Sequence, residues 1–331
     1  MKIIMIIVTG TVGFDHIMDY DGLFANHINP ANIHKLNISF NIEEVTKQIG
    51  GTAANQAYSL GLLGTYPYLV TTAGDDFDQI NAYLKAVGVD TSSVLQIPGK
   101  PCCVGFVMTD KSDNQIWGYA AGAGNATKNL SFVKLAKKVI SKQKPKKPFV
   151  IIAPQNYQAM LNWAKECREL NLAYAFDPAF YIPQMGKAQL KQAILGAELL
   201  FGNDYEIDLI KSKLKLKKLQ FKNPNLKATI KTVGPEGSVI IDNKTGKEFK
   251  IKAAKVQQVI DPTGAGDAYR SGFITGYLNG QSLKVCGQMG AVAAAYAIEH
   301  LGTINHKFTI PQFNKRYKQN YNSTGGTDPA E

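Results

Sequence analysis

Short apolar stretches alternate with amphipathic stretches of helical period through most of this 331-residue chain. The apolar stretches predict strands over 2–9, 68–72, 149–153, 173–177, 198–202 and 228–233. The amphipathic stretches predict helices that include 53–63, 77–87, 155–170, 264–278 and 282–300. Because repeated strand-then-helix units build parallel sheets, we expect a mostly parallel sheet covered by helices, an α/β fold.

Two segments, 13–49 and 93–120, carry strand-type alternation and turn residues instead. Within the second, 104–109 and 115–119 flank a polar turn and predict a hairpin. Ligands of open α/β folds bind at the carboxyl ends of the strands, so a small sheet placed there would act as a lid. The same sheet could instead, or also, form an oligomer interface.

The chain therefore divides into three parts. We expect a main α/β domain (1–12, 50–92 and 121–318), a β-sheet lid (13–49 and 93–120) and a disordered tail (319–331).

The formal net charge of +11 raises the question of nucleic acid. Much of the excess lies in 142–147 and 211–227, and the second segment has lysines alternating with leucines without aromatic partners for base stacking. We interpret it as a solvated helix face and expect no nucleic-acid partner.

The apolar run at 1–8 is too short to span a bilayer, so we expect no membrane association and a cytoplasmic protein. The four cysteines show no CxxC spacing and the five histidines no HExxH box, which favours reduced thiols and disfavours a zinc site.

The segment Asp261-Pro-Thr-Gly-Ala-Gly-Asp267, followed by a helical pattern, carries the strongest chemical signal. A glycine turn at a helix start leaves backbone N–H groups free, and with the helix dipole it forms an anion site suited to a transferring phosphoryl group. The dipole should keep Asp267 ionised, able to accept the proton of an attacking hydroxyl. An ordinary capped helix with a glycine turn would have the same spacing.

A second cluster, Gly50-Gly51-Thr-Ala-Ala-Asn55, precedes another helix. The glycines permit close backbone approach to a ligand, and Asn55 can donate and accept hydrogen bonds to vicinal hydroxyls. A glycine pair before a helix is also common in proteins without such a site. Neither cluster is a P-loop, and Gly10-Thr-Val-Gly13 lacks the third glycine of a dinucleotide fingerprint.

Together, the order and separation of these two motifs closely resemble the ribokinase-like (PfkB) family of carbohydrate and nucleoside kinases. The resemblance covers nearly the whole chain, from Ile3 to about His306, and the later motif is the more specific one. It implies a three-layer α/β/α fold with a β-sheet lid and an ATP-dependent kinase.

The resemblance also implies roles for individual residues. Asp267 would be the general base, with Gly264, Ala265 and Gly266 as the anion hole. The sugar hydroxyls would meet Asp15, Gly50, Gly51 and Asn55.

The ATP side would be formed by Asn203, Thr232, Gly234, Glu236 and Gly237, together with Gly264 and Gly266. Glu206 would hold Mg²⁺ through water. A requirement for a monovalent cation such as K⁺ and a homodimer formed through the lid stay open.

The chain departs from the family pattern in two places. Ala121-Gly-Ala123 replaces a common Pro-Gly-Ala, and Asp177-Pro-Ala-Phe180 replaces an Asp-Pro-Asn followed by arginine. The second change disfavours both plain and phosphorylated sugars as substrates.

Among substrates we favour nucleosides, chiefly adenosine, phosphorylated at the 5′-hydroxyl. Segments 13–18, 34–40 and 176–180 are similar to microbial nucleoside kinases. A purine could stack on lid aromatics, of which we select Phe106 as a substrate contact; the others are Phe40, Trp117 and Tyr119. These rings could equally fill the core of the lid.

Two alternatives remain: a ribokinase- or fructokinase-like sugar kinase, and an inactive binding or regulatory protein. The intact Asp267 and anion hole disfavour the second.

Overall fold

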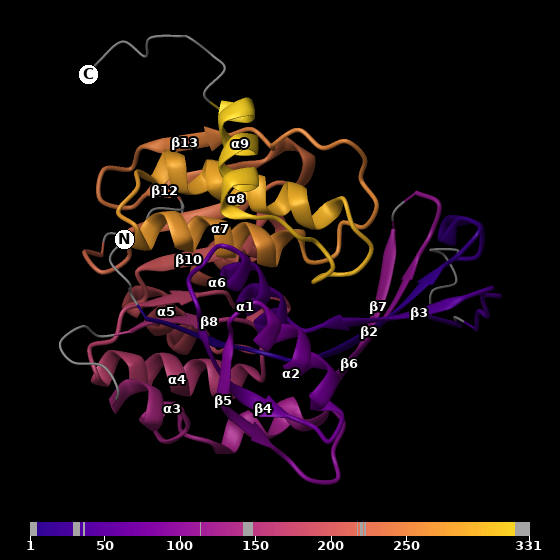
Figure 1. Ribbon diagram of the computed structural model, residues 1–331, viewed down its shortest axis with the longest axis horizontal. Coiled ribbons are helices and arrows are strands. Elements are labelled where there is room, and N and C mark those ends of the chain that lie inside the picture. Colours follow the sequence, from indigo (N-terminus) through magenta and orange to yellow (C-terminus); the bar gives the residue numbers. More distant parts are fainter. Residues whose placement is uncertain are drawn as a thin grey trace.

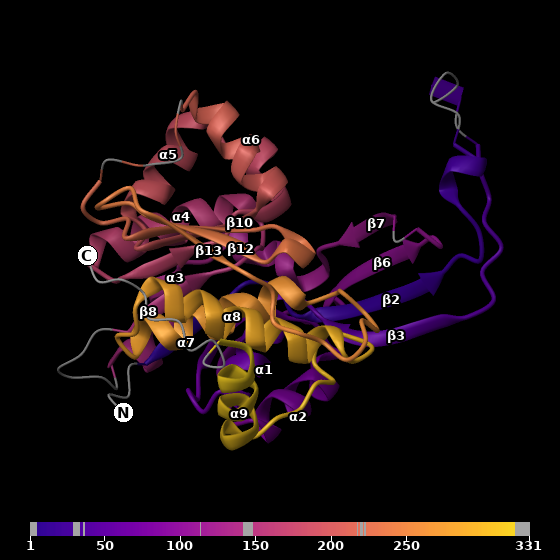
Figure 2. The ribbon, with the colours of Figure 1, turned by 90° about the horizontal axis from the view of Figure 1, so that it is seen from above.

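The structure, a computed structural model, describes residues 5–28, 34–35, 37–112, 114–141, 148–216, 218, 221 and 223–321. A large sheet with helices on both faces forms the body, and a small sheet projects from it (Figures 1 and 2). The expected three-layer α/β/α fold with a separate β sheet is confirmed.

The large sheet has nine strands in the order β13-β12-β11-β10-β9-β8-β1-β4-β5. All pairs from β11 to β5 are parallel, and only β12 and β13 at one edge are antiparallel. The strands are β1 (Ile6–Thr9), β4 (Tyr68–Ala73), β5 (Asp90–Gln96), β8 (Phe149–Ile152), β9 (Tyr174–Phe176), β10 (Leu199–Asn203), β11 (Ala228–Thr232), β12 (Ser238–Asp242) and β13 (Glu248–Ile251). Continuous apolar runs such as β1 and β8 are buried at every residue, as central parallel strands require.

Helices pack on the two faces of this sheet around separate apolar cores (Figure 2). One face is covered by α1 (Thr52–Leu62), α2 (Phe77–Ala86), α7 (Ala265–Leu278), α8 (Leu283–Ile298) and α9 (Ile310–Tyr321). The other is covered by α3 (Phe132–Ser141), α4 (Tyr157–Glu169), α5 (Lys187–Gly196) and α6 (Asp204–Leu214). Helices α7 and α8 lie very close together, since a Cβ at Gly272 would come within 2.5 Å of Met289 O.

The small sheet, which we call the lid, has the strand order β3-β2-β6-β7. Its strands are β2 (Gly13–Asp19), β3 (Val45–Gly50), β6 (Cys103–Thr109) and β7 (Gln115–Ala120). The predicted hairpin is confirmed as β6–β7. Asp15 pairs with Gly105, which pairs with Tyr119, so these three residues share one face; His16 and Phe106 are on the other.

Some boundaries differ from those expected. Residues 93–96, which we placed in the lid, extend β5 along β4 in the large sheet, with Ser93 opposite Val70. Residues 319–321, which we placed in the tail, complete α9, anchored by the buried Phe313. Residues 322–331 lie outside the described residues.

The basic segments also differ from expectation. Helix α6 ends at Leu214, where Lys215 adopts a left-handed conformation with φ 56°, so 211–227 is not one continuous helix face. The cluster 142–147 lies outside the described residues. Across the part of the chain that the structure describes, no helix combines the length and apolar character needed to cross a membrane.

Candidate active site

The N-terminal turn of α7 lies between two cavities. Gly264 and Asp267 line a cavity of about 670 Å³, which we call the acceptor cavity. Ala265 and Gly266 line an apolar cavity of about 290 Å³, which we call the nucleotide cavity. Gly264 caps the helix with φ +80°, and a Cβ there would lie 2.9 Å from Cβ of Thr303. Glycine is therefore required both for the backbone conformation and for the space.

Backbone N–H groups of this turn are available to an anion. Asp261 holds the preceding loop by accepting from Thr263 N at 2.8 Å and Gly302 N at 2.9 Å. The N–H of Ala265 donates to Pro262 O at 3.2 Å, so it is already used. The next N–H groups fall in the first helical turn, where a helix offers no acceptor, and the dipole adds positive potential. The turn can thus stabilise a phosphoryl group passing between the cavities.

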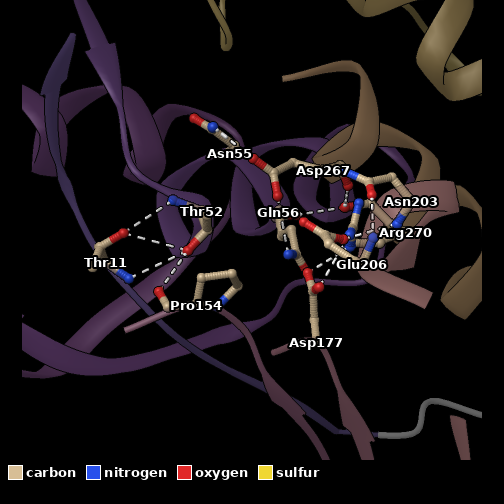
Figure 3. Close-up of polar contacts among 11 residues, drawn as sticks. Thr11, Thr52, Asn55, Gln56, Pro154, Asp177, Asn203, Glu206, Asp267 and Arg270 are labelled. Atoms are coloured by element: carbon tan, nitrogen blue, oxygen red, sulfur yellow. Dashed lines mark hydrogen bonds and ion pairs between the residues drawn. The ribbon is translucent and has the colours of Figure 1, made fainter. Parts of the chain in front are cut away.

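Asp267 receives an amide donor on each carboxylate oxygen (Figure 3). Asn55 Nδ2 donates to Oδ2 at 2.8 Å, and Gln56 Nε2 donates to Oδ1 at 3.1 Å. Burial raises the pKa of Asp267 to about 6, against the lowering effects of Arg270 and the two amides. Burial is the largest influence on this pKa, and it opposes the ionised form that we expected the dipole to favour. At neutral pH the carboxylate is still ionised and can accept a proton.

A buried ion pair lies beneath the turn. Arg270 Nε is 2.5 Å from Asp177 Oδ2, and its Nη2 donates to Oδ1 at 3.0 Å (Figure 3). Burial alone would lower the pKa of Arg270. The negative charges of Asp177, Glu206 and Asp267 outweigh that effect and raise the pKa, so the guanidinium stays charged. A Cβ at Gly266 would lie 2.6 Å from Arg270 Nη1, which places this cation directly against the anion site.

Asp15 enters the acceptor cavity from the lid. Glycines on the neighbouring strands surround it: a Cβ at Gly50 would lie 2.0 Å from Oδ2, and one at Gly105 would lie 2.3 Å from Oδ1. Burial first, and then the charge of Asp267, raise the pKa of Asp15 to about 6. The structure thus brings Asp15, Asn55 and Asp267 into one cavity, which Gly51 also lines with φ +95°.

The Asn203–Glu206 pair forms the N-terminal cap of α6. Asn203 Oδ1 accepts from Glu206 N, and Glu206 Oε2 accepts from Asn203 N, each at 2.8 Å. Both side chains also line the acceptor cavity. Burial, followed by the nearby charge of Asp177, raises the pKa of Glu206. One carboxylate oxygen, Oε1, is not needed for the cap and could hold metal-bound water.

This edge of the cavity can bind a divalent metal ion only if water and substrate phosphates supply most of the metal's ligands. Among the described residues, no group of three His, Cys, Asp or Glu side chains is placed to hold a metal ion. Magnesium is normally bound by one or two carboxylates together with water and substrate phosphates. Glu206 meets that requirement.

The remaining nucleotide-side residues divide in two. Thr232, Gly234 and Gly237 line the nucleotide cavity. Glu236 belongs to the same short turn, η5 (Gly234–Glu236), but its side chain is exposed and does not line that cavity.

Phe106 is not where we expected it. Its ring stacks on His16, with centroids 5.1 Å apart, on the face of the lid opposite Asp15. The aromatic side chains that line the acceptor cavity are Trp117, Tyr119, Phe180 and Tyr181. The prediction that Phe106 contacts a base in this cavity is therefore wrong.

Sequence reasoning also missed Gln56 and Arg270. Each had a local signal: Gln56 follows Asn55 directly, and Arg270 lies three residues after Asp267, on the same face of α7. Their contacts depend on the packing of α1 against α7 and of β9 beside β10, which no local pattern shows.

A family model described as pfkB family carbohydrate kinase matches residues 7–309. The chain belongs to the pfkB family. It is therefore a kinase, and the acceptor and nucleotide cavities lie in a member of a phosphoryl-transferring family.

Several relatives are similar to this chain over most of its length. The nucleoside kinase of Methanothermobacter thermautotrophicus is 30% identical over 304 residues, which cover 90% of each chain. That of Methanocaldococcus jannaschii is 31% identical over 268 residues, covering 80% of this chain and 84% of the relative. The solved structure of Burkholderia thailandensis nucleoside kinase in complex with inosine is 26% identical, with a TM-score of 0.83 over 96% of this chain and 98% of that chain.

Proposed function

We propose that this kinase transfers the γ-phosphoryl group of ATP to the 5′-hydroxyl of a nucleoside, with adenosine as the first candidate. The observation that carries the proposal is the aromatic lining of the acceptor cavity. The similarity to nucleoside kinases, one of them solved with inosine, supports the same substrate class.

Aromatic rings from both parts of the molecule meet in the acceptor cavity. Trp117 and Tyr119 come from β7 of the lid, and Phe180 comes from the short helix η4 (Ala179–Gln184) of the body. The rings of Tyr119 and Phe180 are 5.9 Å apart, edge to face. Phe180 is 55% exposed, so protein atoms cover only part of its apolar ring and a ligand could cover the rest. A flat base could fill this space, whereas a free sugar offers no comparable surface.

The backbone before Phe180 supports a ligand role. Ala179 has a φ of 43°, which is a left-handed backbone conformation. This conformation is unfavourable for any residue that has a Cβ atom. Such strain collects at binding sites, where it directs a side chain toward its ligand. The next residue, Phe180, lines the acceptor cavity.

The proposed reaction uses Asp267 as the base. The substrate hydroxyl gives its proton to the Asp267 carboxylate while its oxygen forms a bond to the γ-phosphorus of ATP. The bond from that phosphorus to the β–γ bridging oxygen breaks, and ADP leaves with the electron pair. The N-terminal turn of α7 and the cation Arg270 stabilise the charge on the transferring group. Asp15 and Asn55 orient the sugar by accepting and donating hydrogen bonds to its hydroxyls.

Magnesium bound with ATP would be held through water by Glu206, and it would supply charge neutralisation at the phosphates. A monovalent cation such as K⁺ stays an open part of the proposal. A cytoplasmic location is the setting in which we expect this activity.

The lid is also the proposed surface for a homodimer. Its face opposite Asp15 carries apolar side chains, among them Val45, Phe106 and Ile116, which are 53%, 47% and 44% exposed. Sedimentation of the wild type and of Ile116→Asp tests this: a wild-type monomer at micromolar concentration would contradict it.

A substrate panel tests the proposed function. With ATP and magnesium, adenosine should have a kcat/KM at least about tenfold above ribose or fructose, because a stacked ring contributes about 1–3 kcal/mol. Phe180→Ala should weaken nucleosides more than free sugars, and Phe106→Ala, which removes a ring from the other face, serves as the comparison. A preference for ribose or fructose would overturn the nucleoside proposal and leave the kinase assignment in place.

A further inference from the structure

Gln56 is a buried polar residue at the interface of α1 and α7. Its side chain is fully buried, and its Nε2 donates to Asp267 Oδ1 at 3.1 Å (Figure 3). Its Oε1 has no hydrogen-bond partner among the residues that the structure describes. The amide therefore makes its contact with Asp267 while leaving a buried carbonyl oxygen unsatisfied.

Such an arrangement is costly for folding alone. A buried acceptor without a partner destabilises a protein, and an apolar side chain of the same shape would avoid that cost. Several other buried residues of α1, such as Ala53, Ala57 and Leu60, are small or apolar. A methionine or leucine would suit the packing, so the glutamine is better explained by what it does to Asp267.

The backbone on which Gln56 acts is well fixed. The hydroxyl of Ser271 donates to Gln56 O at 3.1 Å and to Asp267 O at 2.9 Å, which ties α1 to α7 at this level. With both backbones held, the remaining freedom of the Asp267 carboxylate is rotation about its Cα–Cβ and Cβ–Cγ bonds, which the amides of Gln56 and Asn55 restrict.

We propose that Gln56 is a positioning residue for phosphoryl transfer, which holds the Asp267 carboxylate in the orientation that accepts the substrate proton. Asn55 binds the other oxygen, so the two amides fix both ends of the carboxylate. This inference rests on the proposed role of Asp267 as the base.

Charged groups around Asp267 also affect its pKa, and the effect of Gln56 adds to theirs. Arg270 on the same helix favours the ionised carboxylate, while Asp177 after β9 opposes it. Asp15 in the lid interacts with Asp267 and with Asp261. Because an N–H donor stabilises an ionised carboxylate over a protonated one, Gln56 works in the same direction as Arg270.

The experiment compares pH–rate profiles of Gln56→Met and Gln56→Glu with the wild type. Methionine keeps the length and removes the donor; glutamate keeps the shape and adds a repelling charge. In Gln56→Met we expect kcat to fall by up to about a hundredfold, because the carboxylate is no longer held in the reacting orientation. The KM for the acceptor should change little, and the acidic limb of the profile should move to higher pH by roughly one unit. In Gln56→Glu the limb should move further. Gln288→Met on α8, whose Oε1 accepts from Tyr317, is the matched control.

A measurement without turnover completes the test. The pKa of Asp267 in each folded variant is read from carboxyl ¹³C shifts, assigned by comparison with Asp267→Asn. We expect the pKa of Asp267 to be lowest in the wild type, higher in Gln56→Met and highest in Gln56→Glu. If Gln56→Met does not fold, the isosteric Gln56→Glu carries the comparison.

The outcomes separate the two proposals. A fall in kcat by the same factor at every pH, with an unchanged Asp267 pKa, would reduce Gln56 to a packing role and overturn the inference. Full activity of Asp267→Asn would instead remove the base itself. An inactive Asp267→Asn with an unaltered Gln56→Met would reject Gln56 alone.

Discussion

Asp267→Asn should stabilise the protein at neutral pH while removing most of its activity. Burial raises the pKa of Asp267 to about 6 from 3.8, so keeping this carboxylate ionised costs the folded state free energy above pH 6. A shift of that size corresponds to at most about 3 kcal/mol at pH 7–8. For 331 residues at ~2.1 cal/mol/K each, this is roughly 4 °C in Tm.

The sign follows from the direction of the shift. The folded pKa is raised, so the penalty is full above pH 6, decreases as the pH falls, and is absent below 3.8. The stabilisation by asparagine should therefore shrink to less than about 1 °C near pH 4. The new amide NH₂ would face an N–H donor, but Gln56 can rotate its amide and offer its unpartnered Oε1 instead. This keeps the cost of the substitution small.

Thermal unfolding of ligand-free protein from pH 4 to 8, combined with kinetics, measures both effects. Activity should fall about 10²–10⁴-fold or more, because the shape is kept and the proton acceptor is lost. Asp208→Asn, on the exposed face of α6, is the control for loss of a surface carboxylate. A Tm for Asp267→Asn equal to or below the wild type at pH 8 would refute the argument that burial dominates at this site. A kcat within a few-fold of wild type would refute the base assignment.

Three further predictions concern other parts of the structure. Glu206→Gln should raise the magnesium concentration for half-maximal rate with little effect on acceptor binding, since glutamine can still cap α6; an unchanged magnesium dependence would remove Glu206 from the metal site. Burial lowers the pKa of His306 to about 4, so the wild type should lose up to about 3 kcal/mol of stability as pH falls from 6.5 toward 4. His306→Gln should lack that loss, and parallel unfolding curves for both proteins would count against it. Finally, ATP hydrolysis without an acceptor should be very slow, because the lid is expected to close and exclude water only over substrate; an acceptor-free rate comparable to the kinase rate would contradict this.

Much of the fold could be predicted from local patterns. The period of apolar residues indicated the parallel strands other than β5 and the helices α1, α2, α4, α7 and α8, and turn residues indicated the β6–β7 hairpin. Segment 93–96 was misplaced because the alternation of an edge strand in the body is the same as that of a strand in the lid.

For the site, local motifs selected Asp267, at a helix start, and Asn55, after a glycine pair, whereas Asp15 was named only through the family resemblance. The raised pKa of Asp267 was not predictable, because it depends on burial by segments far apart in the chain.

The lining of the acceptor cavity was decided by tertiary structure. In a strand, adjacent side chains point to opposite faces, so pairing register determines which of two neighbours meets a ligand. The pairing of Gly105 with Asp15 turns Phe106 outward and brings in Tyr119 from the next strand. Gln56 likewise became a candidate only when α1 packed against α7, because its partner lies 211 residues further along the chain.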